Sequence, residues 1–153
     1  IDNDNDLDLI IQNNTEAKFS YNENGHFTTP KFALDSPASY SSVMAAGDID
    51  ADGDLDIAAV AFLPQVDPAI WRKKDLDSVV WFENKQGQGQ EQWQSHSVEK
   101  RHCYHPCVAL GDRDANGLMD IIVGNFVWIN ENSKPGIKAD YLTLFHQLKN
   151  PHL

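Results

Sequence analysis

The chain has 153 residues and a formal net charge of −11, from 23 acidic and 12 basic residues. This excess of carboxylates disfavours nucleic acid as a partner, and the 41% hydrophobic content favours a packed core over a disordered acidic tail. No apolar run approaches the roughly 18 residues of a membrane helix, so we expect no membrane span. The chain begins at Ile1 without a starting Met or a signal-peptide pattern, so we expect a fragment or a processed chain.

An acidic motif occurs three times, and each copy runs into an apolar stretch. The first copy opens the chain at residues 2–8, the second spans residues 48–56 and the third spans residues 112–120. The second and third copies carry glycine at the sixth position, where the first copy has Asn5. The first aspartate of the first copy would lie before Ile1, so the chain is expected to begin inside a repeat.

Four short segments rich in β-branched or aromatic residues lie between the second motif and the third. They are Ser42–Ala46, Asp56–Val60, Ser78–Phe82 and Gln92–Val98. Their composition, and the Gly, Asn or Asp residues that bound them, predict four β-strands. No run of 10 or more residues has helical apolar spacing with caps, and the best helical candidate, residues 141–149, also aligns with the strand at 78–82. The chain is therefore predicted to be all-β.

An aromatic residue ends a second apolar stretch after each motif, at Tyr21, Phe82 and Phe145. The distance from the motif to this aromatic residue is 13, 26 and 25 residues, whereas the distance onward to the next motif is 27 and 30 residues. One connection therefore varies in length. We expect residues 62–74 and 125–138 to be insertions in a single loop of each repeat.

The spacing of the acidic residues suits Ca²⁺. Oxygens at positions 1, 3, 5 and 9 of a tight loop, with the backbone carbonyl of position 7, converge on one point and give a hard-oxygen cage. Without a cation the carboxylates would repel one another, although a solvated acidic turn is the alternative. An EF-hand needs Glu at position 12 and flanking helices, but position 12 here is Ala59 or Val123 in a predicted strand. We therefore predict strand-loop-strand calcium sites, two complete and a third truncated at the N-terminus. The candidate ligands are Asp2, Asp4, Asp6, Asp8, Asp48, Asp50, Asp52, Asp54, Asp56, Asp112, Asp114, Asn116, Leu118 and Asp120, of which Asp54 and Leu118 would use the backbone carbonyl.

The segment Gly47–Ile57, followed by the tract Trp81–Lys85, resembles FG-GAP and VCBS repeats. The resemblance extends from Ile1 to about Gln147, and it is nearer to the VCBS type because neither a Phe-Gly nor a Gly-Ala-Pro tract occurs. Such repeats are the blades of calcium-loaded β-propellers similar to the head of integrin α subunits. The resemblance implies a ring of about seven or eight four-stranded blades, in exported adhesion or binding proteins that take protein or sugar partners.

The resemblance makes the chain a partial β-propeller of about two and a half four-stranded antiparallel blades. The approximate blades are residues 1–39, truncated at the start, residues 40–103, complete, and residues 104–153, truncated at the end. A closed propeller needs at least four blades, so further blades are expected from the rest of a longer chain or from other chains.

The segment His102–Cys107 is the main candidate for other chemistry, because it holds two Cys and two His within six residues. A zinc or copper site is one interpretation, but the spacing is neither a zinc knuckle nor a haem-attachment sequence. The other interpretation is a packed, inert or disulfide-bonded cysteine, since Cys107 aligns with Val43 in a first strand and is expected to face the core.

The remaining aromatic and histidine residues predict no catalytic site. Trp81 and Trp93 lie in predicted strands and are expected in the core between blades, whereas Trp71 and Trp128 lie in the insertions and are candidates for an exposed sugar contact. The other histidines are expected to be surface or interblade hydrogen-bonding groups. They are His26, His96, His146 and His152.

These observations favour a calcium-stabilised binding or scaffold module for a protein or carbohydrate partner. Monodentate aspartates in rigid loops suit the millimolar calcium outside the cell, so an extracellular or periplasmic location is expected. One alternative is a part of a propeller-based enzyme, such as a polysaccharide lyase-like protein, with its chemistry elsewhere in the ring. Another is a structural subunit of a redox or other multi-protein complex.

Overall fold

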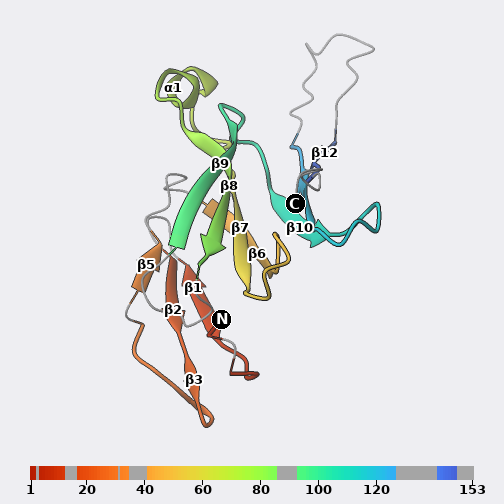
Figure 1. Ribbon diagram of the computed structural model, residues 1–153. Helices are drawn as coiled ribbons and strands as arrows, with labels where there is room; N and C mark the ends of the chain where they lie inside the picture. The colour runs from red at the N-terminus through yellow and green to blue at the C-terminus, as the bar shows by residue number, and fades with distance from the viewer. Residues whose placement is uncertain are drawn as a thin grey trace.

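The computed structural model describes residues 1–2, 4–12, 17–30, 32–34, 41–85, 93–126 and 141–147 (Figure 1). The described residues form twelve strands and one short helix, so the all-β prediction is confirmed. The elements are β1 (Leu9–Gln12), β2 (Ala17–Ser20), β3 (Asn22–Glu23), β4 (His26–Phe27), β5 (Phe32–Leu34), β6 (Ser41–Gly47), β7 (Asp56–Ala61), α1 (Pro68–Lys73), β8 (Asp77–Asn84), β9 (Trp93–Lys100), β10 (Cys107–Gly111), β11 (Asp120–Gly124) and β12 (Leu142–Phe145). Within this part of the chain no helix is long and apolar enough to cross a membrane.

The central sheet is an antiparallel meander in the order β6-β7-β8-β9. Its strands coincide with the four that the sequence predicts between the second and third motifs, apart from Gln92, which lies outside the described residues. Every residue of β7 is buried. A strand buried on both faces needs a covering layer on each side of its sheet, and the two end sheets supply these layers.

The end sheets have three described strands each, in the orders β1-β2-β5 and β10-β11-β12. Both are antiparallel. A separate small hairpin joins β3 to β4 through Asn24 and Gly25, whose φ angles are 55° and 86°. An Asn-Gly pair adopts these angles readily and is the preferred two-residue hairpin turn.

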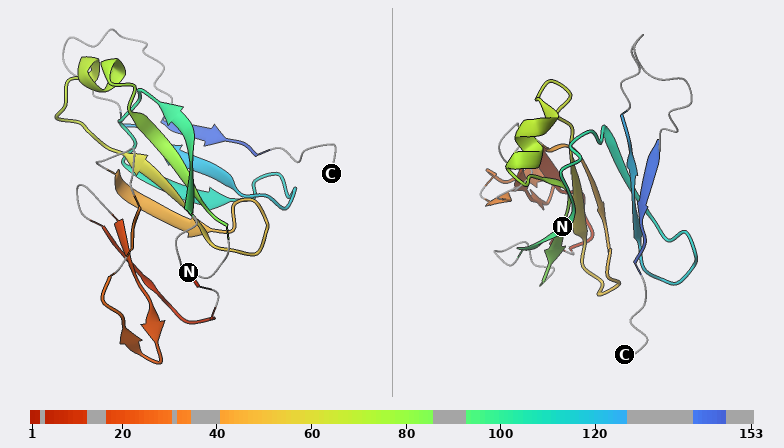
Figure 2. Two further views of the ribbon diagram at one scale, coloured as in Figure 1. Left: turned by 60° about the vertical axis from the view of Figure 1, so that its left-hand side comes forward. Right: turned by 90° about the horizontal axis from the view of Figure 1, so that it is seen from above.

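Two apolar clusters join the three sheets. The first lies between the β1-β2-β5 sheet and the central sheet, where the Phe19 and Trp93 rings stack with centroids 5.1 Å apart. The second lies between the central sheet and the β10-β11-β12 sheet, which stand side by side in the right-hand view of Figure 2. Trp81 packs against the second cluster and Trp93 against the first, so the predicted core positions of these two residues are confirmed.

The outward faces of the two end sheets carry exposed apolar side chains. In β1, Ile10 packs against the first cluster, and the alternate residues Leu9 and Ile11 are 43% and 48% exposed. In β12, Leu142 and Leu144 are 67% and 37% exposed. Successive side chains of a strand point to opposite faces, so these four lie on the sides of the end sheets that face away from the central sheet.

The insertion at residues 62–74 contains a helix that the sequence analysis did not predict. Asp67 caps α1, because its carboxylate accepts the Ala69 N–H at 2.8 Å, and Pro68 follows in the first turn. The helix turns Trp71 into the first cluster, where it is fully buried. The prediction that Trp71 is an exposed sugar contact is therefore wrong, and Trp128 lies outside the described residues.

The predicted position of Cys107 in the core is also wrong, because this residue is exposed. In β10, Val108 and Leu110 pack against the second cluster, so Cys107 points to the outward face. The aligned residue of the central sheet, Val43, is covered because the C-terminal sheet lies against it. Cys103 is buried, and both thiols are free, so they form no disulfide.

Strand pairing corrects the alignment of the first aromatic landmark by one residue. Ile57 pairs with Phe82, and the equivalent Leu9 pairs with Ser20 rather than with Tyr21. Tyr21 therefore corresponds to Glu83. The sequence alignment followed the aromatic side chain, whereas the structural correspondence is set by which residue pairs with the first residue after the last aspartate of the motif.

Candidate metal sites

The second acidic loop, residues 48–56, connects β6 to β7. The carboxylate oxygens of Asp48, Asp50 and Asp52 lie within 4.8 Å of one another. Asp48 also organises the turn, because its two oxygens accept the N–H groups of Asp52 and Gly53, each at 3.1 Å. Gly53 has a φ of 99°, which confirms the positive φ predicted at the sixth position.

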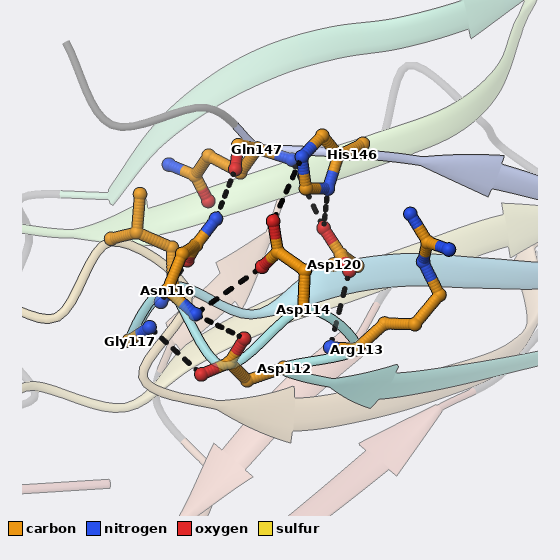
Figure 3. A network of polar contacts seen from close by, with 9 residues as sticks. Asp112, Arg113, Asp114, Asn116, Gly117, Asp120, His146 and Gln147 are labelled. Atoms are coloured by element: carbon orange, nitrogen blue, oxygen red, sulfur yellow. Dashed lines mark hydrogen bonds and ion pairs between the residues drawn. The ribbon is translucent and has the colours of Figure 1, made fainter. Parts of the chain in front are cut away.

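The third loop, residues 112–120, repeats this arrangement between β10 and β11 (Figure 3). The two oxygens of Asp112 accept the N–H groups of Asn116 and Gly117, at 3.0 and 2.8 Å. Gly117 has a φ of 88°. Asp114 and Asn116 take the places of Asp50 and Asp52, and the Asn116 N–H donates to Asp114 Oδ1 at 3.2 Å as the Asp52 N–H donates to Asp50 Oδ1 at 3.3 Å.

The first loop, residues 2–8, shows the same turn from its third position onward. Asp4 Oδ1 accepts the Asp6 N–H at 3.0 Å, and Asn5 has a φ of 71°. The equivalent bond, from the seventh residue to the fifth, is present in the other two loops at 2.9 and 2.7 Å. The three motifs therefore fold into one type of loop.

The aspartate at position 9 has a structural role that the sequence analysis missed. In Asp8, Asp56 and Asp120, one oxygen accepts a hydrogen bond from the second residue of the loop. The other oxygen accepts one from a residue at or just after the end of β2, β8 or β12, the strand that pairs with the strand following the loop. The donors to Oδ2 are the N-terminal ammonium of Ile1 and the N–H groups of Ile49 and Arg113, and the donors to Oδ1 are the N–H groups of Asn22, Asn84 and Gln147. Position 9 therefore fastens the loop to its sheet.

Both oxygens of each position-9 carboxylate already accept a hydrogen bond, but each oxygen has a second lone pair. The predicted ligand role of Asp8, Asp56 and Asp120 therefore stays a prediction. The same is true of the carbonyl groups of Asp54 and Leu118 and of the carboxylate of Asp2. The three loops follow one another along one side of the molecule, opposite α1 (Figure 2, left).

Comparison with known families identifies the repeat. Residues 1–59 match the family described as FG-GAP-like repeat. The chain contains an FG-GAP-like repeat. The match covers the first loop, the β1-β2-β5 sheet and the second loop as far as β7. No curated protein and no solved structure matches the chain.

Negative charge accumulates in the second loop. Burial raises the pKa of Asp50 to about 6, with further contributions from the carboxylates of Asp52, Asp56 and Glu83. Burial also raises the pKa of Asp56, although backbone N–H groups bond to it. Each raised pKa means that the folded loop disfavours the ionised carboxylate. A bound cation would reverse this balance.

A buried oxygen without a partner lies in the first loop. Asp6 Oδ1 is inaccessible to solvent and accepts no hydrogen bond from the part of the chain that the structure describes, and the pKa of Asp6 is raised by burial and then by Asp4. A buried carboxylate oxygen without a hydrogen bond is costly. The three loops offer carboxylate, amide and carbonyl oxygens as ligands, and this donor chemistry fits a hard divalent ion such as Ca²⁺.

The third loop differs because a histidine lies over it. His146 Nδ1 is 2.7 Å from Asp120 Oδ1, and Nε2 is 3.4 Å from Asp114 Oδ2 (Figure 3). Burial alone would raise the pKa of Asp120, but hydrogen bonds from the Gln147 N–H, from His146 and from the Arg113 N–H lower it. Sequence reasoning expected only a hydrogen-bonding group at His146, and the structure places it against two candidate ligands.

The segment His102–Cys107 divides in the structure. His102 and His105 converge on Glu99, and Cys103 and Cys107 do not belong to this cluster. Burial, with the nearby charges of Glu99 and Asp77, raises the pKa of the Cys103 thiol to about 11, so it stays protonated at neutral pH. Cys107 lies on the outward face of the C-terminal sheet.

Proposed function

We propose that this chain is a calcium-stabilised segment of a β-propeller and acts as an exported binding or scaffold module for a protein or carbohydrate partner. The observation that carries the proposal is the repetition itself. Three loops with one hydrogen-bonding pattern are each attached to a sheet, and each sheet turns the same face toward the next.

Equivalent residues show this repetition. Ala58 in β7 faces the C-terminal sheet, and its counterpart in the first sheet, Ile10, faces the central sheet. In the opposite direction, Met44 in β6 packs toward the first sheet, and its counterpart Val108 packs toward the central sheet. One spatial relation therefore connects successive sheets, as it connects successive blades of a propeller.

The same relation supports the presence of further blades. Leu9 occupies the position of Ile57, and Leu144 occupies the position of Trp81, and both of these central-sheet residues are covered by a neighbouring sheet. The outward apolar faces of the end sheets are therefore the faces that adjacent blades would cover. We propose that the rest of a longer chain, or other chains, supply those blades.

Calcium is the ion that the loops suit best. The side-chain ligands at positions 1, 3 and 5 are carboxylate and amide oxygens, which suit hard cations and not soft ones. Magnesium demands a nearly ideal octahedron and keeps several waters, whereas calcium accepts six to eight oxygens in irregular geometry. Aspartate loops of this kind suit millimolar calcium, which supports an extracellular or periplasmic location.

The partner surface is proposed at the two long connections, residues 62–74 after β7 and residues 125–138 after β11. The connection after β7 carries α1, on which Ile70 is 46% exposed, at the opposite end of the sheet from the calcium loop. Loops held by a rigid scaffold commonly carry binding functions. The acidic loops would then stabilise the scaffold, and the long connections would meet the partner.

Calorimetric titration of the 153-residue chain with Ca²⁺, with Mg²⁺ as the comparison ion, tests the proposal. We expect saturable calcium binding in at least two equivalents. The double variant Asp48→Asn/Asp50→Asn should lose one equivalent, and Asp112→Asn/Asp114→Asn should lose a different one. Stoichiometry that is unchanged in both double variants would refute the metal assignment. Further acidic motifs in the complete gene sequence would show that the same chain supplies the other blades, and their absence together with a monomeric protein in solution would refute the propeller.

A further inference from the structure

A second cluster of metal-binding side chains lies outside the acidic loops, where the chain passes from the central sheet to the C-terminal sheet. We call Glu99, His102 and His105 the junction cluster, since their ligand atoms lie within 4.8 Å of one another. Glu99 Oε2 is 2.6 Å from His105 Nε2, and Glu99 Oε1 is 3.6 Å from His102 Nδ1. The two imidazole rings meet edge to face with centroids 4.8 Å apart.

The backbone that carries the junction cluster is fastened on both sides. Arg101 has a φ of 66°, so the chain turns sharply after β9 and brings His102 back toward Glu99. The His105 N–H donates to the Ala61 carbonyl at 3.1 Å, which fixes the segment to β7. The Phe126 N–H donates to the Tyr104 carbonyl at 2.8 Å, which fixes it to the chain after β11. Preorganised ligands of this kind lose little entropy when they bind an ion.

His105 and Glu99 each have a second partner that orients the side chain. His105 Nδ1 lies 3.3 Å from the Gly124 carbonyl oxygen, which can only accept, so Nδ1 carries a proton and Nε2 faces Glu99. Ser78 Oγ donates to Glu99 Oε2 at 2.8 Å. Metal-binding histidines and carboxylates are typically held by outer partners of this sort, which fix the tautomer and the ring orientation.

We propose that the junction cluster binds a borderline divalent transition ion, with Zn²⁺ as the best match, through Glu99, His102 and His105. Two imidazoles and one carboxylate are a ligand set of open zinc sites, in which water takes the fourth position. The exposure suits this arrangement, because the His105 side chain is fully buried whereas that of His102 is 42% exposed. The fourth position would therefore face solvent beside His102.

The ion would replace the hydrogen that Glu99 and His105 share. Zinc–ligand bonds of about 2.0–2.2 Å at a tetrahedral angle separate two ligand atoms by about 3.3 Å. The pair must therefore open by about 0.7 Å from its 2.6 Å contact, which the half-buried Glu99 side chain can supply. Because Glu99 lies one residue before the end of β9, and His105 bonds to Gly124 in β11, the bound ion would hold the central sheet against the C-terminal sheet.

The chain contains a matched control. Glu83 Oε2 and His96 Nε2 form the same kind of pair at 2.6 Å, but without a second histidine among the described residues around it. This pair therefore offers two ligands where the junction cluster offers three. Among the described residues, the hydrogen bonds and ion pairs of His102 and His105 go to Glu99, Gly124 and the neighbouring backbone, and none goes to an acidic loop. Zinc binding and calcium binding can therefore be tested separately.

The test is calorimetric titration of the full 153-residue chain with ZnCl₂ in saturating Ca²⁺, so that the acidic loops do not take up zinc. We expect one zinc equivalent. His102→Ala should weaken binding 10- to 100-fold, as is typical when a metal site loses a ligand or its support. The His96→Ala variant should bind as the wild type does. His102 is half-exposed, so its variant should fold, and circular dichroism checks this.

Two further readouts decide the result. Added Co²⁺ should give the visible absorption of a tetrahedral or five-coordinate site in the wild type and lose it in Glu99→Gln. Zinc should raise the melting temperature of the wild type and not that of His102→Ala. Absent zinc binding, equal binding by His102→Ala, or equal weakening by His96→Ala would each overturn the proposal and leave the cluster a hydrogen-bonded junction. None of these outcomes would affect the calcium titration.

Discussion

The substitution Asp50→Asn should have opposite effects on stability with and without calcium. In the folded chain without metal, burial and the neighbouring carboxylates raise the pKa of Asp50 from 3.8 to about 6. At pH 7.5 the group is ionised in both the folded and the unfolded chain, so the raised pKa is a full cost to folding. A shift of about two pKa units corresponds to about 3 kcal/mol, and solvent screening at this half-exposed site reduces it to about 1 kcal/mol.

Without calcium, Asp50→Asn should therefore raise the free energy of unfolding by about 1 kcal/mol at pH 7.5. This gain should vanish as the pH falls from 6 to below 3.8, where the wild-type carboxyl is protonated in both states. With calcium at about 100 times its dissociation constant, the wild type gains about 2.7 kcal/mol per site. The variant has lost a ligand and most of that gain, so it should become the less stable chain by about 1 kcal/mol.

Urea unfolding followed by tryptophan fluorescence, in EDTA and in excess calcium, measures both effects. The control is Asp114→Asn, at the equivalent position of the third loop. Asp114 lies 3.4 Å from His146 Nε2, so its neutralisation removes an attractive contact and should give no stabilisation in EDTA. If Asp50→Asn lowers stability in EDTA, or shifts it equally in both buffers, the electrostatic reasoning for the loop is refuted.

Three other substitutions test separate parts of the structure. Asp56→Ala should lower the free energy of unfolding by about 2–6 kcal/mol with or without calcium, because two buried N–H groups lose their acceptor; a loss seen only with calcium would contradict this in urea titrations. Glu83→Gln should cost about 1.5–3 kcal/mol at neutral pH in EDTA, because Lys85 and His96 lower the pKa of the buried Glu83 below 4.5. That difference should be present above pH 4.5 and disappear on acidification through the folded pKa, and a pH-independent difference would exclude the explanation. Gly53→Ala should cost about 1–2 kcal/mol, measured by melting, because φ there is 99°; an unchanged melt would show that the turn is not constrained.

The central sheet and the turn of each loop were predictable because their signals are local. Short segments rich in β-branched or aromatic residues, bounded by Gly, Asn and Asp, mark the strands. Glycine at Gly53 and Gly117 marks the positive φ of the sixth position. The fourth position also has positive φ, 63° at Ala51 and 57° at Ala115, and alanine gives no signal for it.

Features that depend on distant contacts were not predictable. A six-residue helix is too short to show apolar periodicity, so α1 and the burial of Trp71 escaped detection, although the Asp67-Pro68 pair was a capping signal. The hydrogen bond that Asp56 accepts from the Asn84 N–H joins residues 28 positions apart in the sequence. The hairpin at Asn24 and Gly25 depends on a local signal instead, because the Asn-Gly pair by itself predicts a two-residue hairpin turn.

The position of Cys107 shows a different limit. Its alignment with Val43 was sound, and the aligned residues do share one side of their sheets. The error came from assuming that every such side is covered, although no sheet lies on the outward side of the C-terminal sheet among the described residues. An alignment transfers orientation between repeats, and burial follows only where a next repeat is present.

The exposed apolar faces of the two end sheets affect how the purified chain associates. The exposed face of β1 beside Leu9 and the exposed face of β12 beside Leu144 correspond to the two different sides of the contact between successive sheets. The β1-β2-β5 sheet of one molecule can therefore pack on the β10-β11-β12 sheet of another. Head-to-tail addition of this kind leaves an exposed sheet face after every step, unless the contacts close into a ring. Sedimentation over a range of concentrations should therefore show growth by successive whole molecules, and capping either end should arrest it.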